Sequence, residues 1–341
     1  MRLRSQWIAP ATTGRSAVQV VRHLIGVQAQ IPSAAALAVR ARTTAVRAAD
    51  VQRDSLPGGL LVRTWLMRGT LHLAAAEDVD WLLAALAPPV LRASHRRHAE
   101  LGLDAATLSR SADVLVRRLE DGPATRRALF ARLAEHGIDP AGQRGIHVIR
   151  HAALRGLLCC GPDHGREQTW VRRAAGTSAD VSRDAALAEL ASRYRVAYGP
   201  AGAGDLAAWS GLPASDAQHA WHLAGDAGDE RSRLEGGRST VRLLPHFDPY
   251  LLGYADRGHA VGAEHRRTVW TGGGYVLPTV MVNGWAVGTW HSKTTERRIA
   301  LTVSPFEAGK LGARVTAGID AQVVDIGRFV DREVSWSNVQ K

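Results

Sequence analysis

Residues 124–173 constrain the fold of this chain more than any other stretch, because helix, turn and strand patterns follow one another within it. The run TRRALFARLAEHG places Leu129, Phe130 and Leu133 on one side of a helix, and Gly137 is typical of a helix end. IDPAG then predicts a turn, and QRGIHVIRHAALRGLLCC predicts a second helix. Two short strand-like runs surround the turn GPDHG. Helix, turn, helix and hairpin is the order of a winged helix-turn-helix.

The second helix of this segment has two chemically different sides. Its apolar side is expected to face the core and is formed by Ile146, Ile149, Ala153 and Leu157. The opposite side is basic and falls within a narrow arc formed by Arg144, His147, His151 and Arg155. A basic face opposite a core face is what a helix needs to lie against phosphates, so these four residues are predicted to bind DNA. The alternative is a solvated face without a partner.

The rest of the chain predicts four units in one integrated body. A mostly helical unit at residues 1–115, with a winged helix among the possibilities, precedes the winged helix at 116–180, and helical runs interrupted by GPAG and LPAS predict a second copy at 181–235. From residue 239 the pattern changes to strands, and MVNGWAV predicts a hairpin because Asn283-Gly284 suits a type I′ turn. We therefore expect a mostly helical α+β fold of tandem winged helix-turn-helix units with a C-terminal β-rich segment at 236–341.

The charge of the chain predicts its class of partner. The formal charge is +11, since 43 Lys and Arg residues exceed 32 Asp and Glu residues, and lysine occurs only at Lys293, Lys310 and Lys341. Arginine binds phosphates through a planar, bidentate fork. We therefore expect a polyanionic partner, with double-stranded DNA ahead of an anionic membrane.

Several other classes of protein are disfavoured. No apolar run reaches the length of a signal peptide or the roughly 18–20 residues of a membrane span, which predicts a cytoplasmic protein that lies at the nucleoid when bound to DNA. Cys159 and Cys160 are adjacent, which suits neither an ordinary disulfide nor a zinc site. The histidines form no pair at metal-binding spacing beside an acid, and no phosphate-binding glycine loop occurs. We expect no metal, no cofactor and no membrane or protein partner, and a monomer.

The stretch LIGVQAQIP at residues 24–32 ends a short apolar helix and presents Gln28 and Gln30 one residue apart. Residues two apart point the same way in an extended backbone, so the two carboxamides can converge on one point. The alternative is that these side chains cap a helix end or bind nearby backbone groups.

Three stretches together resemble one family: LIGVQAQIPSAAALAVRAR, LVRTWLMRGTLHLAAAEDVDWLL, and RLLPHFDPYLLGYADR with PTVMVNGWAVGTW. In order and wording they are similar to the winged-helix DNA glycosylases of the AlkZ and YcaQ type, bacterial enzymes that excise N7-alkylated guanines and can unhook interstrand crosslinks. The resemblance covers nearly the whole chain. It implies tandem winged helices with a C-terminal β-structure around a basic concave surface for duplex DNA.

In that family a Gln-x-Gln or Gln-x-Asp pair marks the catalytic loop, and Gln28 and Gln30 stand at that place here. The second glutamine resembles the AlkZ branch, which is associated with self-resistance to DNA-alkylating natural products, whereas the YcaQ branch carries aspartate there. The resemblance implies a monofunctional DNA glycosylase acting on N7-alkylguanine, including bulky adducts or interstrand crosslinks, with Gln28 and Gln30 as its catalytic residues.

Two glutamines suit such a substrate. A carboxamide does not titrate usefully, so neither side chain can be a general base. Their oxygens can instead accept hydrogen bonds from a water and aim its lone pair. An N7-alkylated guanine is already cationic and departs as a neutral base without an acid to protonate it. The residues leave open which anion stabilises the sugar cation, and no lysine lies near the pair to form a Schiff base.

Other residues are predicted to contact DNA near this loop. Arg63, Arg68 and His72 in RTWLMRGTLHL are candidates for binding phosphates or the lesion strand, although a structural turn with an internal ion pair explains the arginines equally well. The hairpin with Asn283, Trp290 and His291 is a candidate probe of the minor groove, and the alternative is a core role for its tryptophans, Trp285 among them.

The residue Asp248 precedes Pro249, which predicts a helix cap ahead of a role as the stabilising anion. Two rival functions also stay open. One is a non-catalytic winged-helix regulator, which would bind duplex DNA and leave damaged bases attached. The other is a resistance protein that sequesters the free toxin in a tryptophan-lined pocket.

Overall fold

The order of elements predicted for residues 124–173 is confirmed. The strands β4 (Ala124–Thr125), β5 (Leu158–Cys160) and β6 (Thr169–Arg172) form a sheet of order β4-β6-β5. Three helices precede or separate these strands: α6 (Ala105–Glu120), α7 (Arg126–Glu135) and α8 (Arg144–Leu154). Leu129 and Leu133 of α7 are buried, and Gly137 follows the helix with a left-handed φ of 71°. This is the topology of a winged helix.

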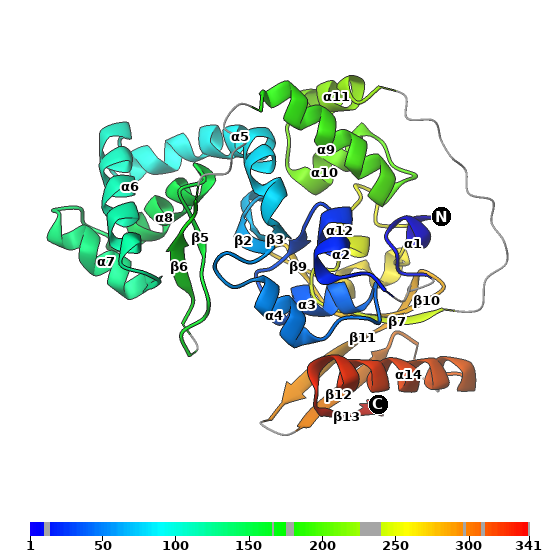
Figure 1. Cartoon of the computed structure of the whole chain (residues 1–341). Coiled ribbons are helices and arrows are strands. Elements are labelled where there is room, and N and C mark those ends of the chain that lie inside the picture. Colours follow the sequence, from blue (N-terminus) through cyan, green and yellow to red (C-terminus); the bar gives the residue numbers. More distant parts are fainter. Residues whose placement is uncertain are drawn as a thin grey trace.

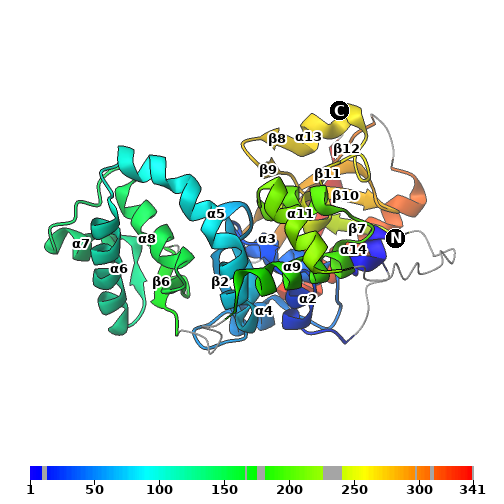
Figure 2. The ribbon, with the colours of Figure 1, turned by 90° about the horizontal axis from the view of Figure 1, so that it is seen from above.

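In the computed structural model the winged helix lies to one side of a larger body, and the long helix α5 (Val79–Glu100) leads from one to the other (Figure 1, Figure 2). The structure describes residues 1–9, 14–165, 167–174, 181–225, 240–295, 298–307 and 311–339. None of the helices in these described segments is long and apolar enough to cross a membrane.

The N-terminal part of the body surrounds a small antiparallel sheet of order β1-β3-β2. Its strands are β1 (Val27–Gln28), β2 (Leu61–Trp65) and β3 (Leu71–Ala75). The helices around it are α1 (Arg2–Ser5), α2 (Ala17–His23), α3 (Pro32–Arg40), α4 (Ala48–Asp54) and the short 3-10 turns η1 (Met67–Gly69) and η2 (Ala76–Asp78). The apolar helix before the glutamines ends at His23, so Gln28 lies in extended strand.

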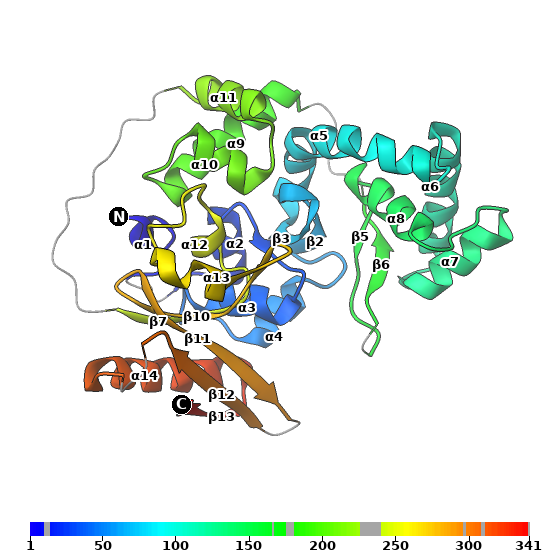
Figure 3. The same cartoon turned by 180° about the vertical axis from the view of Figure 1, so that it is seen from behind.

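Three helices form the described part of the unit at residues 181–235 (Figure 3). They are α9 (Arg183–Tyr198), α10 (Ala203–Ser210) and α11 (Ala214–Leu223). No strand occurs among the described residues 181–225, so this unit has the helices of a winged helix without a wing in that range. Two of the three expected unit boundaries, at 180/181 and 235/236, lie outside the described residues. The division into four units therefore stays a prediction.

The predicted C-terminal β-rich segment is confirmed as a five-stranded sheet of order β13-β12-β11-β10-β7 with α14 (Ala313–Val330) packed against it. Its strands are β7 (Val241–Leu244), β10 (Thr279–Val282), β11 (Trp285–Thr294), β12 (Arg298–Pro305) and β13 (Glu333–Asn338). Smaller elements precede β10, namely α12 (Pro249–Leu252), η3 (Ala263–His265), α13 (Arg266–Val269), β8 (Trp270–Gly272) and β9 (Tyr275–Val276). Asn283 and Gly284 have φ of 52° and 90°, the positive values that a two-residue type I′ turn requires.

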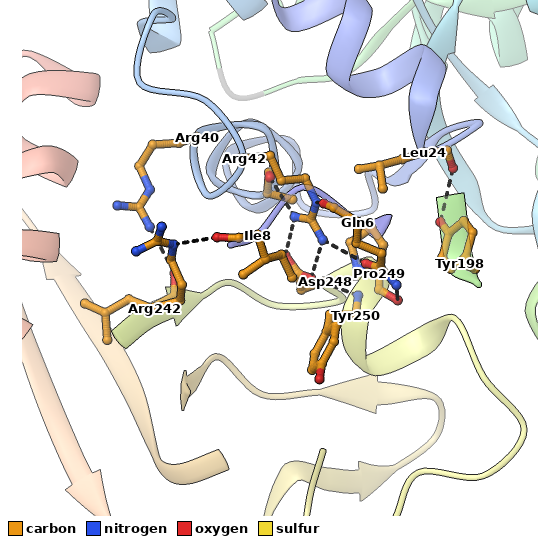
Figure 4. A network of polar contacts seen from close by, with 12 residues as sticks. Gln6, Ile8, Leu24, Arg40, Arg42, Tyr198, Arg242, Asp248, Pro249 and Tyr250 are labelled. Atoms are coloured by element: carbon orange, nitrogen blue, oxygen red, sulfur yellow. Dashed lines mark hydrogen bonds and ion pairs between the residues drawn. The ribbon is translucent and has the colours of Figure 1, made fainter. Parts of the chain in front are cut away.

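Apolar clusters join parts of the chain that are far apart in the sequence. One apolar cluster runs from Ile25 through α5 and the winged helix to Tyr254. Buried arginines of the N-terminal part also bind the C-terminal segment (Figure 4). Arg40 donates to Asp325 of α14 and to the carbonyl oxygen of Leu243 in β7, at 3.0 and 3.1 Å. A charge buried away from water needs such partners, and these contacts therefore fix the two ends of the chain together.

Candidate active site

The three-stranded sheet of the body lines up the first candidate side chains. Gln28 of β1 pairs with His72 of β3, and His72 pairs with Thr64 of β2. Residues directly opposite each other in neighbouring strands project from the same face of a sheet. The structure therefore brings together Gln28 and His72, which lie far apart in the sequence, while Gln30 lies exposed just beyond the end of β1.

The two glutamines contact each other and an arginine. Gln28 Nε2 donates to Gln30 Oε1 at 2.5 Å, and Gln28 Oε1 accepts from Arg68 Nη2 at 2.8 Å. A guanidinium has donors only, so the Gln28 oxygen must face Arg68 and its amide nitrogen must face Gln30. The two carboxamides converge as expected. They form a hydrogen-bond chain that runs from Arg68 through Gln28 to Gln30, so the Gln28 oxygen already has a partner.

A tight turn between β2 and β3 positions Arg68. Arg68 itself has a left-handed φ of 54°, and Gly69 follows with a φ of 64°. The turn is closed by the N–H of Leu66, which donates to the carbonyl of Thr70 at 3.0 Å. Arg68 Nη1 donates to the carbonyl oxygen of Trp209 in α10, and burial lowers the pKa of this guanidinium from its usual value.

His72 is buried and neutral. Its Nδ1–H donates to the carbonyl of Thr70 at 3.0 Å, and 2% of the residue is exposed. Burial first, and the neighbouring charge of Arg68 second, lower the pKa of His72 to about 3. An imidazole with that pKa cannot serve as a general base near neutral pH. It also lacks the exposure needed to bind a phosphate, so the predicted DNA contact of His72 is corrected to a buried position opposite Gln28 in the sheet.

Arg63 lies on the other face of the sheet. It pairs with Leu73, one residue away from the row of Gln28 and His72, and successive side chains of a strand alternate between faces. The Arg63 side chain is 12% exposed, and its Nη2 lies 3.6 Å from a carboxylate oxygen of Asp163. The predicted DNA-binding role of Arg63 is therefore corrected to the internal ion pair that the sequence left as its alternative.

The basic face of α8 packs largely against α5. Arg144 Nε donates to the carbonyl of Asp139 at 2.8 Å, and its Nη1 donates to the carbonyl of Leu101. The ring centroids of His147 and His151 lie 5.4 and 5.8 Å from that of His98 in α5. Three of the four side chains predicted to bind DNA thus contact other parts of the protein and are only partly exposed.

The surroundings of the two histidines on this face disfavour their charged form. Burial lowers the pKa of His151 to about 4 and lowers that of His147 in the same direction. Only Arg155 is exposed, at the edge of a cleft of about 700 Å³ between α5 and α6. The face is therefore less basic than the sequence predicts, because α5 covers its middle.

The structure adds Arg150 of α8, which the sequence analysis missed. A side-chain carbon at Gly69 would collide with Arg150 Nη2, so this guanidinium reaches the turn that carries Arg68. Its Nε is buried without a hydrogen-bond partner, and no hydrogen bond or ion pair of Arg150 occurs among the described residues. Burial lowers the pKa of this guanidinium. Arg150 lies on α8 outside the arc that contains His147, and the helical spacing alone therefore gave no indication that it contributes to a DNA-binding surface.

The predicted probe hairpin separates into buried and exposed residues. Trp290 is 5% exposed and its Nε1 donates to the carbonyl of Leu244 at 2.9 Å, so its predicted DNA contact is corrected to a core position. Asn283 Oδ1 accepts from the N–H of Thr240 at 2.8 Å and thereby holds the type I′ turn. Trp285, on β11 beside this turn, is 52% exposed. His291 is exposed on β11 and stays a candidate for contact with DNA.

The carboxylate of Asp248 is fully buried and occupied. It accepts from Arg42 Nη1 and Nη2, both at 2.9 Å, and from the N–H of Tyr250 at 2.9 Å (Figure 4). The cap predicted from Asp248-Pro249 is confirmed, and the same carboxylate neutralises a buried guanidinium. Within the described residues, no cluster of three or more His, Cys, Asp or Glu side chains is placed to hold a metal ion.

The comparisons with known proteins agree with one another. A family model described as DNA glycosylase AlkZ-like matches residues 21–329. A relative from Streptomyces sahachiroi, named interstrand DNA cross-link repair glycosylase, is 33% identical over 345 residues, covering 89% of this chain and 88% of the relative. The solved structure of Streptomyces sahachiroi DNA glycosylase AlkZ has a TM-score of 0.77 and 27% identity, covering 98% of this chain and 97% of that chain. This chain belongs to the AlkZ-like family of DNA glycosylases and is itself an enzyme of that class.

Proposed function

We propose that this glycosylase hydrolyses the N-glycosidic bond of N7-alkylguanine in double-stranded DNA, with Gln28 and Gln30 as its catalytic residues. The observation that carries the proposal is a pair of hydrogen-bonded carboxamides, neither of which is bonded to a carboxylate in the part of the chain that the structure describes. The relative from Streptomyces sahachiroi is named for interstrand cross-link repair, so bulky adducts and crosslinks belong among the proposed substrates.

An alkylated purine is the substrate that such a site can serve. Alkylation at N7 makes the guanine cationic, so it leaves as a neutral base and needs no proton from the protein. What remains for the enzyme is to place a water against the anomeric carbon, and positioning alone contributes up to roughly 7–11 kcal/mol in the best-oriented systems. Undamaged guanine is a much poorer leaving group and should stay attached.

Three side chains support contact with the DNA. Arg155 and His291 are exposed, and Arg150 presents a guanidinium without an internal partner beside the turn of Arg68. A cation of this kind gains most from a phosphate, since the phosphate supplies the hydrogen-bond acceptors that the protein does not. We propose that these residues contact the backbone of the duplex, and not Arg63, which is paired with Asp163, or His72, which is buried.

The test is single-turnover release of base from a duplex with one N7-methylguanine, by wild type, Gln28→Ala and Gln30→Ala after treatment with a chelator. We expect release by wild type and a loss of roughly 10²-fold or more in both variants, because each removes one member of a positioned pair. DNA binding is measured in parallel and should be retained. Release that survives in both variants would contradict the catalytic role of the glutamines.

The same assay separates the rival functions. A protein that binds the duplex and releases no base, from this lesion or from a bulky adduct, would be a binder without chemistry. A protein that binds the free alkylating toxin in the absence of DNA would be a sequestering protein. Excision in single turnover contradicts both.

A further inference from the structure

We infer that Arg68 is a positioning residue, which orients the Gln28 carboxamide so that the oxygen of Gln30 becomes the acceptor for the attacking water. The inference rests on the proposed function, because it assigns separate parts to the same pair of glutamines. It departs from the sequence-based expectation, in which both oxygens hold the water.

The polarity of the hydrogen-bond chain leads to this assignment. Arg68 occupies the Gln28 oxygen at 2.8 Å, which turns the Gln28 amide nitrogen toward Gln30 Oε1 at 2.5 Å. Gln28 is 7% exposed, whereas Gln30 is exposed. A carbonyl oxygen has two lone pairs, so Gln30 Oε1 can still accept one hydrogen bond from a water. Without Arg68, nothing among the described residues distinguishes the two ends of the Gln28 amide.

Arg68 is itself held in one position by α10, a helix that is distant in sequence but in direct contact with it. Its Nη1 donates to the carbonyl of Trp209 near the end of α10. The residue that follows that helix, Gly211, has a φ of 80°, and a Cβ there would lie 2.8 Å from the Cα of Arg68. Glycine at position 211 therefore lets α10 approach the turn closely enough to hold the guanidinium. No carboxylate pairs with Arg68 among the described residues, so its donors are directed at the two oxygens.

The polarity also predicts an asymmetry between two conservative substitutions. In Gln30→Glu, the new carboxylate still accepts from Gln28 Nε2. In Gln28→Glu, the new carboxylate binds Arg68 but offers Gln30 an acceptor in place of a donor, so the Gln30 amide must turn over. We expect Gln28→Glu to lose roughly 10²-fold in single-turnover rate, as for a misplacement of about 1 Å, and Gln30→Glu to lose less.

The first experiment reads the orientation without requiring activity. Side-chain NH₂ signals of Gln28 and Gln30 are recorded by ¹H–¹⁵N NMR and assigned with Gln28→Leu and Gln30→Leu. Wild type should show a Gln28 NH₂ pair protected from exchange, and Arg68→Met should lose this protection. Gly211→Ala should cause the same loss from a residue that touches neither glutamine. The control is Arg195→Met, because Arg195, like Arg68, donates through both Nη atoms, but its acceptors are the backbone carbonyls of Gly225 and Trp221 and it contacts no glutamine. An unchanged Gln28 signal in Arg68→Met would overturn the inference.

The second experiment is a double-mutant cycle on base release from N7-methylguanine DNA. If Arg68 acts through Gln28, Arg68→Met should lose roughly 10²-fold in wild type and nothing further in a Gln28→Ala background. Losses that multiply would mean that Arg68 acts on the DNA or the sugar directly. An Arg68→Met protein with weaker DNA binding and a shallower salt dependence would likewise overturn the inference, because a phosphate contact contributes roughly one unit to that slope.

The two experiments fail separately. If wild type releases no base from any lesion, the proposed function fails, while the NMR signals still decide whether Arg68 orients Gln28. If wild type is active and the Gln28 NMR signals are unchanged in Arg68→Met, the proposed function stands and the positioning role of Arg68 is contradicted.

Discussion

Replacing Asp248 with asparagine should destabilise this protein strongly, because the carboxylate is the counter-charge of a buried arginine. Asp248 and Arg42 are both fully buried, and two hydrogen bonds of 2.9 Å join them. The asparagine side chain would keep one oxygen but no charge, so the Arg42 guanidinium would stay buried without compensation. Removing one partner of such a pair typically costs about 3–5 kcal/mol.

The helix cap adds a second contribution that a second variant isolates. Asp248 also accepts from the N–H of Tyr250 at the start of α12, and losing a cap costs about 1 kcal/mol. We therefore expect a loss of about 3–5 kcal/mol for Asp248→Asn, which keeps an oxygen for the cap, and about 4–6 kcal/mol for Asp248→Ala. At roughly 2 °C per kcal/mol for a chain of this size, the Asp248→Asn variant should melt roughly 6–10 °C below wild type.

The assay is the free energy of unfolding in urea at pH 7, with Asp104→Ala as the matched control. Asp104 caps α6 through the N–H of Thr107 at 2.7 Å and has no buried charge to neutralise, so its loss should stay near about 1 kcal/mol. An Asp248→Asn protein no less stable than this control would refute the reasoning.

Three further predictions concern pH, the tryptophans and the salt dependence. Burial lowers the folded-state pKa values of His72, His23 and His151 to about 3, 4 and 4, from 6.5. Below pH 6.5 these histidines therefore bind more protons in the unfolded chain than in the folded protein. Their neutral, buried state contributes fully to the free energy of unfolding above pH 6.5, and this contribution is lost as the pH falls toward 4. His151→Gln should reduce the fall of Tm between pH 6.5 and 4. An unchanged dependence of Tm on pH would contradict a contribution from His151. Trp290→Ala should cost about 3–5 kcal/mol in urea unfolding, and Trp285→Ala about 0.5 kcal/mol or less, because only Trp290 is buried. Arg150→Met should weaken binding to any duplex and lower the logarithmic salt slope by roughly one, and an unchanged slope would contradict a phosphate contact.

Local patterns in the sequence predicted local structure well. The order of α7, α8, β5 and β6 follows from helical spacing, a glycine at a helix end and turn residues within one short stretch. The turn at Asn283-Gly284 follows from the φ angles that only a few residue types adopt readily. Each of these signals depends on neighbours within a few positions, so no knowledge of the tertiary fold was needed.

The faces of elements were harder to predict, because they depend on what packs against them. Arg63 and His72 lie in neighbouring strands of one sheet, yet strand alternation and register send them to opposite faces. The spacing of α8 predicts a DNA-binding face because it contains no information about α5. In the structure His98 of α5 packs against His147 and His151 and covers part of this face. A periodicity identifies two sides of a helix, and the chain elsewhere decides which side meets solvent.

Net charge has the same limitation as a guide to the DNA-binding surface. Arg42 and Arg40 neutralise Asp248 and Asp325 inside the body, and Arg68 donates to a carbonyl and a carboxamide. None of these guanidinium groups can bind a phosphate without giving up an internal partner. The arginines available to DNA are those, such as Arg150 and Arg155, for which the described residues supply no hydrogen bond or ion pair. The formal charge of +11 therefore measures the attraction of the whole molecule for a polyanion, whereas the site of contact is determined by which cations the fold leaves without partners.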